Sequence, residues 1–286
     1  MNAQLQSGFA IGIQSRVPWD DYAALEGTNI TRLKLMAKSP LHYAYGTQAK
    51  TPALSLGIAA HCAVLEPERF ARQFAVWDRR TDGGRMSPRN GRVWDDFCEI
   101  HSGKTVITAD ECDLARAIQC AVRGNALAMR YLEAGDPEVT LQWVLGERQC
   151  KGRVDWLTGA SAQPVLVGLK TARDCRHMVF GSSAARLCYH WQWAYYADGY
   201  HAIKGVNPKV VEIVVESAAP HAVAVYVIND DILAQGREEY ERALARLTEC
   251  ELDNQFPGPQ LDEEELSLPS WVYPSGDELG DLGLEG

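Results

Sequence analysis

Asp155 and Lys170 are the two residues whose types and placement point most directly to chemistry. The text C-K-G-R-V-D-W-L covers residues 150–157 and P-V-L-V-G-L-K-T covers 164–171, so each charge interrupts an apolar run. A carboxylate can hold a hard cation such as Mg²⁺ through oxygen. A lysine beside it can orient an attacking water or stabilise the negative charge that develops on phosphorus. The pair therefore indicates metal-assisted hydrolysis of a phosphate ester.

Two helical spacings add weaker candidates. Gln192 and Tyr196 are four residues apart, as are Gly57 and His61, so each pair would share one face of a helix. Ordinary structural roles remain open for all of these residues, because aromatic stripes and lone histidines usually belong to the core. A buried carboxylate at 155 could likewise be paired with Arg153 or with the lysine, since it is costly to bury alone.

The elements that must position these residues follow from periodicity and turn signals. The apolar run at 164–170 is typical of a strand buried on both faces, and 139–157 has the form of a hairpin. The order of helices, three strands, helix, two strands and helix predicts an α/β or α+β fold with a central mixed β-sheet flanked by helices. We expect helices over 29–38, 54–65, 93–101, 109–132, 183–203 and 230–250, and strands over 139–145, 151–157, 164–170, 210–216 and 222–228.

Composition disfavours membrane insertion, secretion and cysteine-based metal sites. No run approaches 18 consecutive apolar residues, and the N-terminus lacks the basic start and apolar stretch of a signal peptide. The eight cysteines form no C-x-x-C pair, which argues against a zinc ribbon or an iron–sulfur cluster. We therefore expect a reduced, cytoplasmic protein.

Four motifs in a fixed order resemble the RecB-type branch of the PD-(D/E)xK nuclease superfamily. They are G-x-x-x-H at 57–61, G-R-V-D at 152–155, L-K-T at 169–171 and Q-x-x-x-Y at 192–196. Longer phrases resemble the phage- and prophage-encoded exonucleases of the RecE type, such as exodeoxyribonuclease VIII. These phrases are L-K-L-M-A-K-S-P-L-H-Y (33–43), G-I-A-A-H-C-A-V-L-E-P-E-R-F (57–70), C-K-G-R-V-D-W-L (150–157) and L-P-S-W (268–271).

The resemblance implies a restriction-endonuclease-like core and a 5′→3′ exonuclease that acts on linear double-stranded DNA in phage-type recombination. It also implies a Mg²⁺ or Mn²⁺ cofactor, a ring-shaped homo-oligomer (trimer or tetramer) and a partner single-strand annealing protein of the RecT type. Two alternatives stay open. One is a DNA-end-binding or assembly protein that keeps the fold without cutting, and the other is a related RecB-type nuclease with a repair role.

Carried over by position, the resemblance assigns roles at the metal. His61 and Asp155 would be ligands, together with the main-chain carbonyl of Leu169. Lys170 would orient the water or stabilise charge, and Glu138 is a weaker acidic candidate.

Contacts to DNA are expected from two further groups. Gln192 and Tyr196 would help to hold the DNA or shape the site. The side chains predicted to grip phosphates are Arg153, Ser39, Lys34, Lys38, Arg85 and Arg89. Within this group the serine and the two lysines could hold a 5′-phosphate. The last two arginines belong to a Gly- and Arg-rich loop at 78–92, whose alternative is a simple solvated loop.

Gly168 departs from the family pattern, which has Asp or Glu two residues before the lysine. Without that acid the site lacks a ligand that contributes negative charge. Three explanations stay open: a substitution made to disable the protein, a degenerate member that does not cut, or compensation by a neighbouring acid, with Glu138 the first candidate. The chain is therefore expected to be an impaired nuclease unless another acid completes the site.

The charge distribution separates a domain from a tail. The net charge is −10, but residues 251–286 hold ten acids and no Lys or Arg, so the rest of the chain is neutral, with 28 acids and 28 bases. We expect a single nuclease domain over 1–256, with a helical N-terminal part, and an acidic, flexible tail over 257–286. The tail is either merely solvated, or it repels non-productive DNA or binds a partner. A neutral domain predicts a local basic groove rather than a broad basic face.

Overall fold

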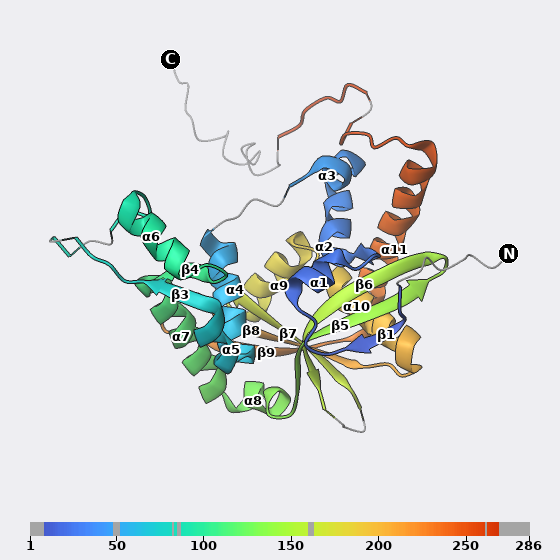
Figure 1. Ribbon diagram of the computed structural model, residues 1–286. Helices are drawn as coiled ribbons and strands as arrows, with labels where there is room; N and C mark the ends of the chain where they lie inside the picture. Colours follow the sequence, from blue (N-terminus) through green and yellow to red (C-terminus); the bar gives the residue numbers. More distant parts are fainter. Residues whose placement is uncertain are drawn as a thin grey trace, which may run out of the picture.

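A mixed sheet of seven strands forms the centre of the protein, and helices pack on both of its faces (Figure 1). The computed structural model describes residues 9–47, 52–81, 83–84, 87–159, 163–260 and 262–268. The strand order is β1-β5-β6-β7-β8-β9, with β2 pairing with β6 in addition. The strands are β1 (Gly12–Gln14), β2 (Thr28–Asn29), β5 (Gly135–Leu145), β6 (Arg148–Thr158), β7 (Val165–Ala172), β8 (Lys209–Glu216) and β9 (Val223–Ile228).

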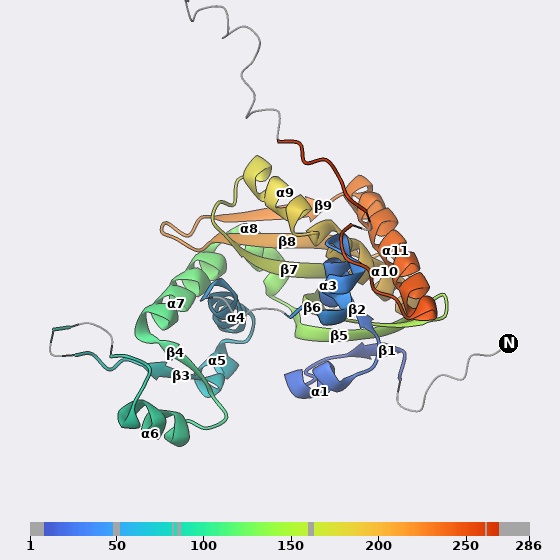
Figure 2. The same ribbon diagram turned by 90° about the horizontal axis from the view of Figure 1, so that it is seen from above.

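Two sets of helices cover the two faces of this sheet (Figure 2). One set is α4 (Pro52–Leu65), α7 (Ala109–Gly124) and α8 (Ala126–Leu132), and the other is α9 (His177–Arg186), α10 (Tyr189–Lys204) and α11 (Asp230–Asp253). Strand β8 shows the division, because Val211 and Ile213 pack with residues of α4, α7 and α8, while Val210 and Val214 pack with residues of α9 and α10. The predicted α/β class, with a central mixed sheet flanked by helices, is confirmed.

A smaller layer lies beside α4 and α7. Strands β3 (Phe74–Trp77) and β4 (Thr105–Thr108) pair in parallel as a separate two-stranded sheet. The remaining elements are α1 (Trp19–Ala24), α2 (Ile30–Leu33), the 3₁₀ helix η1 (Lys34–Ala37), α3 (Pro40–Tyr45), α5 (Pro67–Gln73) and α6 (Arg92–Ile100). Four of the short strands, β1 to β4, were not predicted, because two to four residues are too few to show a period of two.

Three predicted helices differ in extent from the observed ones, and in each case the reason is local. The helix expected over 109–132 is interrupted at Asn125, whose side chain accepts a hydrogen bond from the N–H of Ala128 and so begins a new helix. The single helix expected over 183–203 is two helices, because Cys188 adopts a left-handed conformation (φ 51°) between α9 and α10. The helix expected over 29–38 is α2 followed by η1, with Asn29 as its N-cap.

Strands β6 and β7 part from one another, and this split positions the candidate site. Their antiparallel pairing consists of Trp156 with Val167 and Leu157 with Leu166. The other half of β6 pairs with β2 at residues 150 and 151 instead. The segment around Asp155 therefore faces an opening between two strands rather than a continuous ladder.

In the described part of the chain, no helix is long and apolar enough to cross a membrane. Residues 254–260 and 262–268 follow α11 without regular structure apart from single turn and bend positions. The boundary predicted between a domain ending at 256 and an acidic tail stays a prediction, because most of 257–286 lies outside the described residues.

Candidate active site

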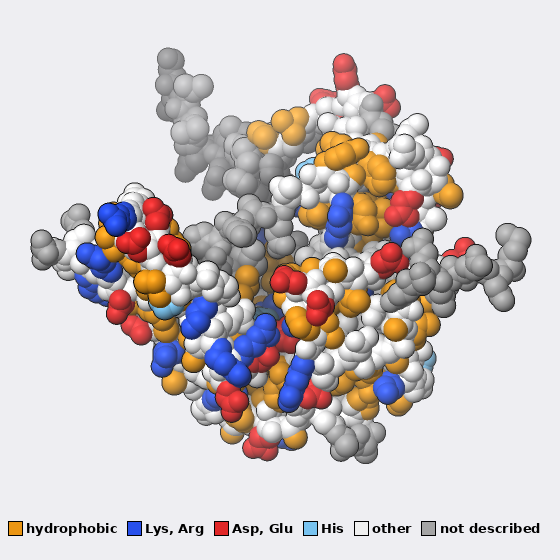
Figure 3. Space-filling model, viewed as in Figure 1, with side chains coloured by type: hydrophobic (Ala, Val, Ile, Leu, Met, Phe, Trp, Pro, Cys, Tyr) orange, Lys and Arg blue, Asp and Glu red, His pale blue; other side chains and the backbone are white. Residues whose placement is uncertain are grey.

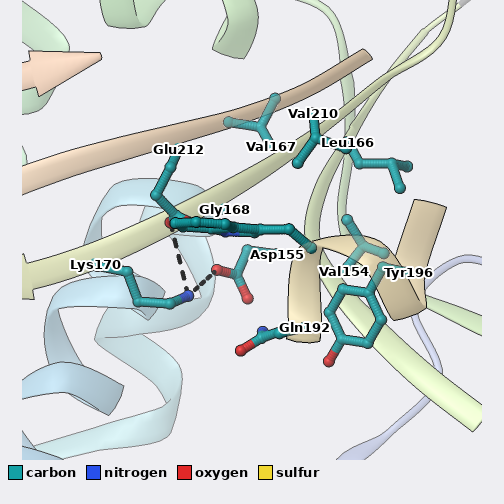
Figure 4. Close-up of a pocket in the computed structure, with 11 residues that line it drawn as sticks. Val154, Asp155, Leu166, Val167, Gly168, Lys170, Gln192, Tyr196, Val210 and Glu212 are labelled. Atoms are coloured by element: carbon teal, nitrogen blue, oxygen red, sulfur yellow. Dashed lines mark hydrogen bonds and ion pairs between the residues drawn. The ribbon is translucent and has the colours of Figure 1, made fainter. Parts of the chain in front are cut away.

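Three neighbouring strands bring three charged side chains to one pocket (Figure 4). Asp155 comes from β6, Lys170 from β7 and Glu212 from β8. The Lys170 ammonium lies 3.5 Å from Oδ2 of Asp155 and 3.7 Å from Oε1 of Glu212. The pocket is lined by Val154, Asp155, Leu166, Val167, Gly168, Lys170, Gln192, Trp193, Tyr196, Val210 and Glu212. The structure thus brings the predicted Asp155–Lys170 pair together and adds an acid that was not predicted.

Asp155 is held in its charged form at the split between β6 and β7. Its Oδ2 accepts a hydrogen bond of 2.8 Å from the main-chain N–H of Leu169, which the parted strands would otherwise leave without a ladder partner. Nδ1 of His61 on α4 lies 3.9 Å from the same oxygen. Burial alone would raise the pKa of Asp155, but Lys170, His61 and the Leu169 N–H outweigh it and hold this pKa below its usual range.

Glu212 is the functional candidate that the sequence analysis missed. Its side chain is fully buried, and Trp193 donates its indole N–H to Oε2. Within the described residues, Oε1 forms no hydrogen bond and faces the Lys170 ammonium. Burial raises the pKa of Glu212, and the charge of Asp155 adds to this against the opposing effect of Lys170. A signal was present, because one glutamate interrupts the apolar run V-V-E-I-V-V of β8.

Gly168 has a structural reason to be glycine. Its partner in the parallel register of β7 and β8 is Glu212. A Cβ atom added at Gly168 would lie 2.5 Å from both carboxylate oxygens of that glutamate, which is far inside van der Waals contact. The carboxylate of Glu212 therefore occupies the space that a side chain at position 168 would need.

Glu138 and Arg153 form an ion pair beside this site, in which Arg153 is buried and Glu138 is partly exposed. Nε of Arg153 donates a hydrogen bond of 2.6 Å to Oε2 of Glu138. Glu138 has a left-handed backbone (φ 53°), an unfavourable conformation for a residue with a side chain that is often found at functional sites. Burial and the nearby Asp155 raise its pKa. Arg153 is 8% exposed and packs over the rings of Trp19 and Tyr22, which argues against the DNA contact predicted for it.

Lys34 brings a second cation to the pocket from the N-terminal helical part. Its ammonium donates a 3.0 Å hydrogen bond to Oε1 of Gln192 and lies over the ring of Tyr189, which Lys170 also faces. Burial and the charge of Lys170 lower the pKa of Lys34 to about 7. Tyr196, one turn after Gln192, packs where Gly152 has no side chain, since a Cβ there would lie 2.7 Å from its ring.

Replacing Lys34 with methionine is expected to stabilise the protein in the absence of DNA, by ~1–3 kcal/mol at pH 6. A lysine whose pKa is about 7 in the folded protein, against its ordinary value of 10.5, favours the unfolded chain, which binds the proton more tightly. The destabilisation of the folded protein by this lysine is therefore at its full value below pH 7, and it disappears as the pH rises towards 10.5. Urea unfolding at pH 6 and pH 9 should show the larger gain at pH 6. Lys38→Met, at an exposed neighbour, should change stability by less than ~0.5 kcal/mol at either pH.

Other residues predicted to bind phosphate lie away from the pocket or are engaged elsewhere. Ser39 is 2% exposed and caps α3, with its hydroxyl 2.7 Å from Nδ1 of His42. Arg89 pairs with Glu111, and Arg85 lies outside the described residues. On the face shown in Figure 3, basic and acidic side chains are interspersed, without a broad basic surface.

The residues present fit a divalent cation in their donor chemistry. The carboxylates of Asp155 and Glu212 are hard oxygen donors, and the carbonyl oxygen of Leu169 lies 3.4 Å from the Lys170 ammonium. The buried Oε1 of Glu212 lacks a hydrogen-bond donor among the described residues, as expected of an atom that takes a ligand. Over the same residues, no three His, Cys, Asp or Glu side chains already form a metal cluster. The Lys170 ammonium lies between the carboxylates instead.

Comparison with known proteins identifies the fold and the family of the chain. A crystal structure from Eubacterium rectale, described as a "Putative exonuclease", matches with a TM-score of 0.60 at 13% identity, over 94% of this chain and 100% of that one. The structures of SSO0001 and of VC1899 from Vibrio cholerae give TM-scores of only 0.27 and 0.20, at 11% and 13% identity. They cover 76% and 78% of this chain and 88% and 57% of theirs. None of the curated proteins matches the sequence.

The E. rectale structure has the same overall fold. The PD-(D/E)xK superfamily predicted from the four motifs is confirmed by a family model. Members of this superfamily generally use divalent metal ions. A family model for a PDDEXK-like domain matches residues 30–261, which include every strand of the main sheet except β1 and β2. The chain therefore belongs to the family of the PDDEXK-like domain of unknown function DUF3799.

Proposed function

We propose that the protein is a metal-dependent deoxyribonuclease that degrades linear double-stranded DNA from its 5′ ends. The observation that carries this proposal is the Asp155–Lys170 ion pair at the split between β6 and β7 of a PDDEXK-like fold. Support for exonuclease rather than endonuclease activity comes from the RecE-type phrases in the sequence and from the name of the E. rectale relative.

In this proposal each side chain has a task that its surroundings allow. Asp155, the Leu169 carbonyl and His61 would hold Mg²⁺ or Mn²⁺ at the split. When bound, the cation would supply Lewis-acid stabilisation of phosphate charge and lower the pKa of water. Lys170, fixed by its ion pairs, would orient the attacking water or offset charge on the scissile phosphate. Lys34, joined to Gln192, would provide a further positive charge for the DNA backbone.

The biological setting belongs to the same proposal. The activity would serve phage-type recombination, in which the strand exposed by digestion passes to a single-strand annealing protein of the RecT type. A ring-shaped homo-oligomer would enclose the duplex and keep the enzyme on one DNA end. The support for both is the RecE-type resemblance, which extends from about residue 29 to 271.

The test is digestion of a linear duplex that carries a 5′ label at one end, beside the same sequence as a covalently closed circle. We expect Mg²⁺- or Mn²⁺-dependent release of the label from the linear duplex as a short product, and no cutting of the circle. Asp155→Asn, which is isosteric and keeps an acceptor for the Leu169 N–H, should lower the rate by ~10²–10³-fold. Equal cutting of circle and linear DNA would contradict the exonuclease assignment. Binding of ends without cutting would favour the non-cleaving alternative.

A further inference from the structure

We propose that Glu212 supplies the second carboxylate of the metal site, in place of the acid expected at position 168. The inference rests on the proposed function, because it assigns a further ligand to the same divalent cation. It replaces the three explanations for Gly168 by one: the acid has moved to the neighbouring strand, and glycine is the consequence of that move.

The register of the sheet places Glu212 beside the position where the family pattern has its acid. Gly168 pairs directly with Glu212, and the register of Trp156 with Val167 places Asp155 opposite Gly168 when continued by one residue. The three positions therefore form a line across β6, β7 and β8. Strands in a sheet lie about 4.8 Å apart, so the longer glutamate side chain can extend over the glycine towards the middle of this line.

The position of the carboxylate is the second step. Both oxygens of Glu212 lie 2.5 Å from the point where a Cβ of residue 168 would be, and its Oε1 lies 3.7 Å from the Lys170 ammonium. An aspartate at position 168 would place its own carboxylate within the same small region, next to the same lysine. Glu212 therefore offers the pocket the charge and the oxygen atoms that the family motif provides from β7.

The third step is that packing alone does not account for a glutamate here. Its flanking residues Val211 and Ile213 are fully buried, and a buried carboxylate is costly compared with another apolar residue. The ammonium of Lys170 already has Asp155 as a partner, so a second acid is not needed to neutralise it. Trp193 fixes one oxygen and leaves the other without a hydrogen-bond donor among the described residues. One oriented and one open oxygen is the arrangement expected of a metal ligand.

The test compares Glu212→Gln with Glu216→Gln on the same strand. The glutamine keeps an acceptor for Trp193 and removes the charge, while Glu216 lies at the end of β8, where it accepts from the N–H of Cys175. Titration calorimetry with Mn²⁺ alone should show that Glu212→Gln binds the ion at least about tenfold more weakly than the parent chain. The affinity of Glu216→Gln should equal that of the parent. Hydrolysis of linear DNA should fall by ~10²–10³-fold in the first and stay unchanged in the second. Circular dichroism of both variants, compared with the parent chain, checks that they are folded.

A relocation variant tests the exchange of positions directly. In Gly168→Asp/Glu212→Ala the carboxylate returns to β7 and the clash with the glutamate is removed. We expect this variant to bind Mn²⁺ at least about tenfold more tightly than Glu212→Ala alone. If it binds no better, the two positions are not interchangeable and the inference is overturned.

The remaining outcomes separate this inference from the proposed function. If the parent chain cuts DNA and Asp155→Asn does not, while Glu212→Gln binds Mn²⁺ and cuts as the parent does, the function stands and the role of Glu212 is overturned. If the parent chain neither binds Mn²⁺ nor cuts DNA, the proposed function fails and the inference fails with it.

Discussion

Replacing Lys170 with methionine is expected to remove nuclease activity by ~10²–10⁴-fold and to destabilise the metal-free protein by ~3–5 kcal/mol. Both effects have one physical origin, because the ammonium lies 3.5 Å from the largely enclosed carboxylate of Asp155 and 3.7 Å from the fully buried carboxylate of Glu212. Without it, the charges of Asp155 and Glu212 repel one another, and Lys34 is the next cation among the described residues whose charge acts on Glu212. Removal of one member of a buried ionic group is costly because it leaves the other charges uncompensated.

The loss of stability in Lys170→Met should depend on pH and on metal. Without the lysine, the pKa of each carboxyl in the folded protein rises above its unfolded value, so folding is favoured by protonation and is weakened as the pH increases. Chemical unfolding in EDTA should therefore show a larger loss at pH 8 than at pH 5. Added Mg²⁺ or Mn²⁺ should restore part of the stability, since the cation replaces the missing positive charge. It should not restore DNA hydrolysis.

Lys209→Met provides the matched control for Lys170. Lys209 begins β8, is only partly exposed, and donates a hydrogen bond of 3.0 Å to the hydroxyl of Tyr131 rather than to a carboxylate. Its replacement should change activity by less than about twofold, without metal-dependent rescue of stability. If Lys170→Met keeps activity comparable to that of the control, Lys170 is a structural ion-pair partner and the catalytic role is wrong.

The Asp155–Lys170 pair could be predicted because Asp155 lies between two apolar residues and Lys170 follows the apolar run 165–169. The two strands follow one another in the chain, so their pairing needed no knowledge of distant contacts. Glu212 could not be assigned in this way. Its role depends on the parallel register of β7 with β8, which is set only after α9 and α10 cross over between the two strands. A single acid in an apolar strand is visible in the sequence, but its neighbour across the sheet is not.

The predicted phosphate contacts show a second limit of prediction from the sequence. Arg153 and Ser39 are polar residues that resemble surface groups in the sequence, yet tertiary packing buries both of them. Arg153 is turned inward by its pair with Glu138, and Ser39 by its role as the N-cap of α3. Lys34 was predicted as a basic contact and does reach the pocket, but through Gln192 on α10 rather than together with Ser39. Residue type indicates which side chains can bind a phosphate, and only packing decides which are placed to do so.

Gly168→Ala is expected to destabilise the metal-free protein by ~1–3 kcal/mol, although alanine normally suits the interior of a strand better than glycine. The reason is the added Cβ, which would lie 2.5 Å from both oxygens of Glu212. That carboxylate is the end of a side chain, but it is fully buried and held by Trp193, so it cannot move aside freely. Urea unfolding in EDTA, compared with the parent chain, measures this effect.

A double-mutant cycle shows whether Glu212 causes that loss. In a Glu212→Ala background the clash is absent, so Gly168→Ala should change stability by no more than ~0.5 kcal/mol, which gives a coupling free energy of ~0.5–3 kcal/mol between the two positions. Gly181→Ala on α9 is the control, because a Cβ there meets open space and should show no coupling to Glu212. A coupling near zero would mean that Glu212 does not occupy the space beside Gly168 in solution. The glycine would then be a lost acid rather than the space that a relocated acid requires.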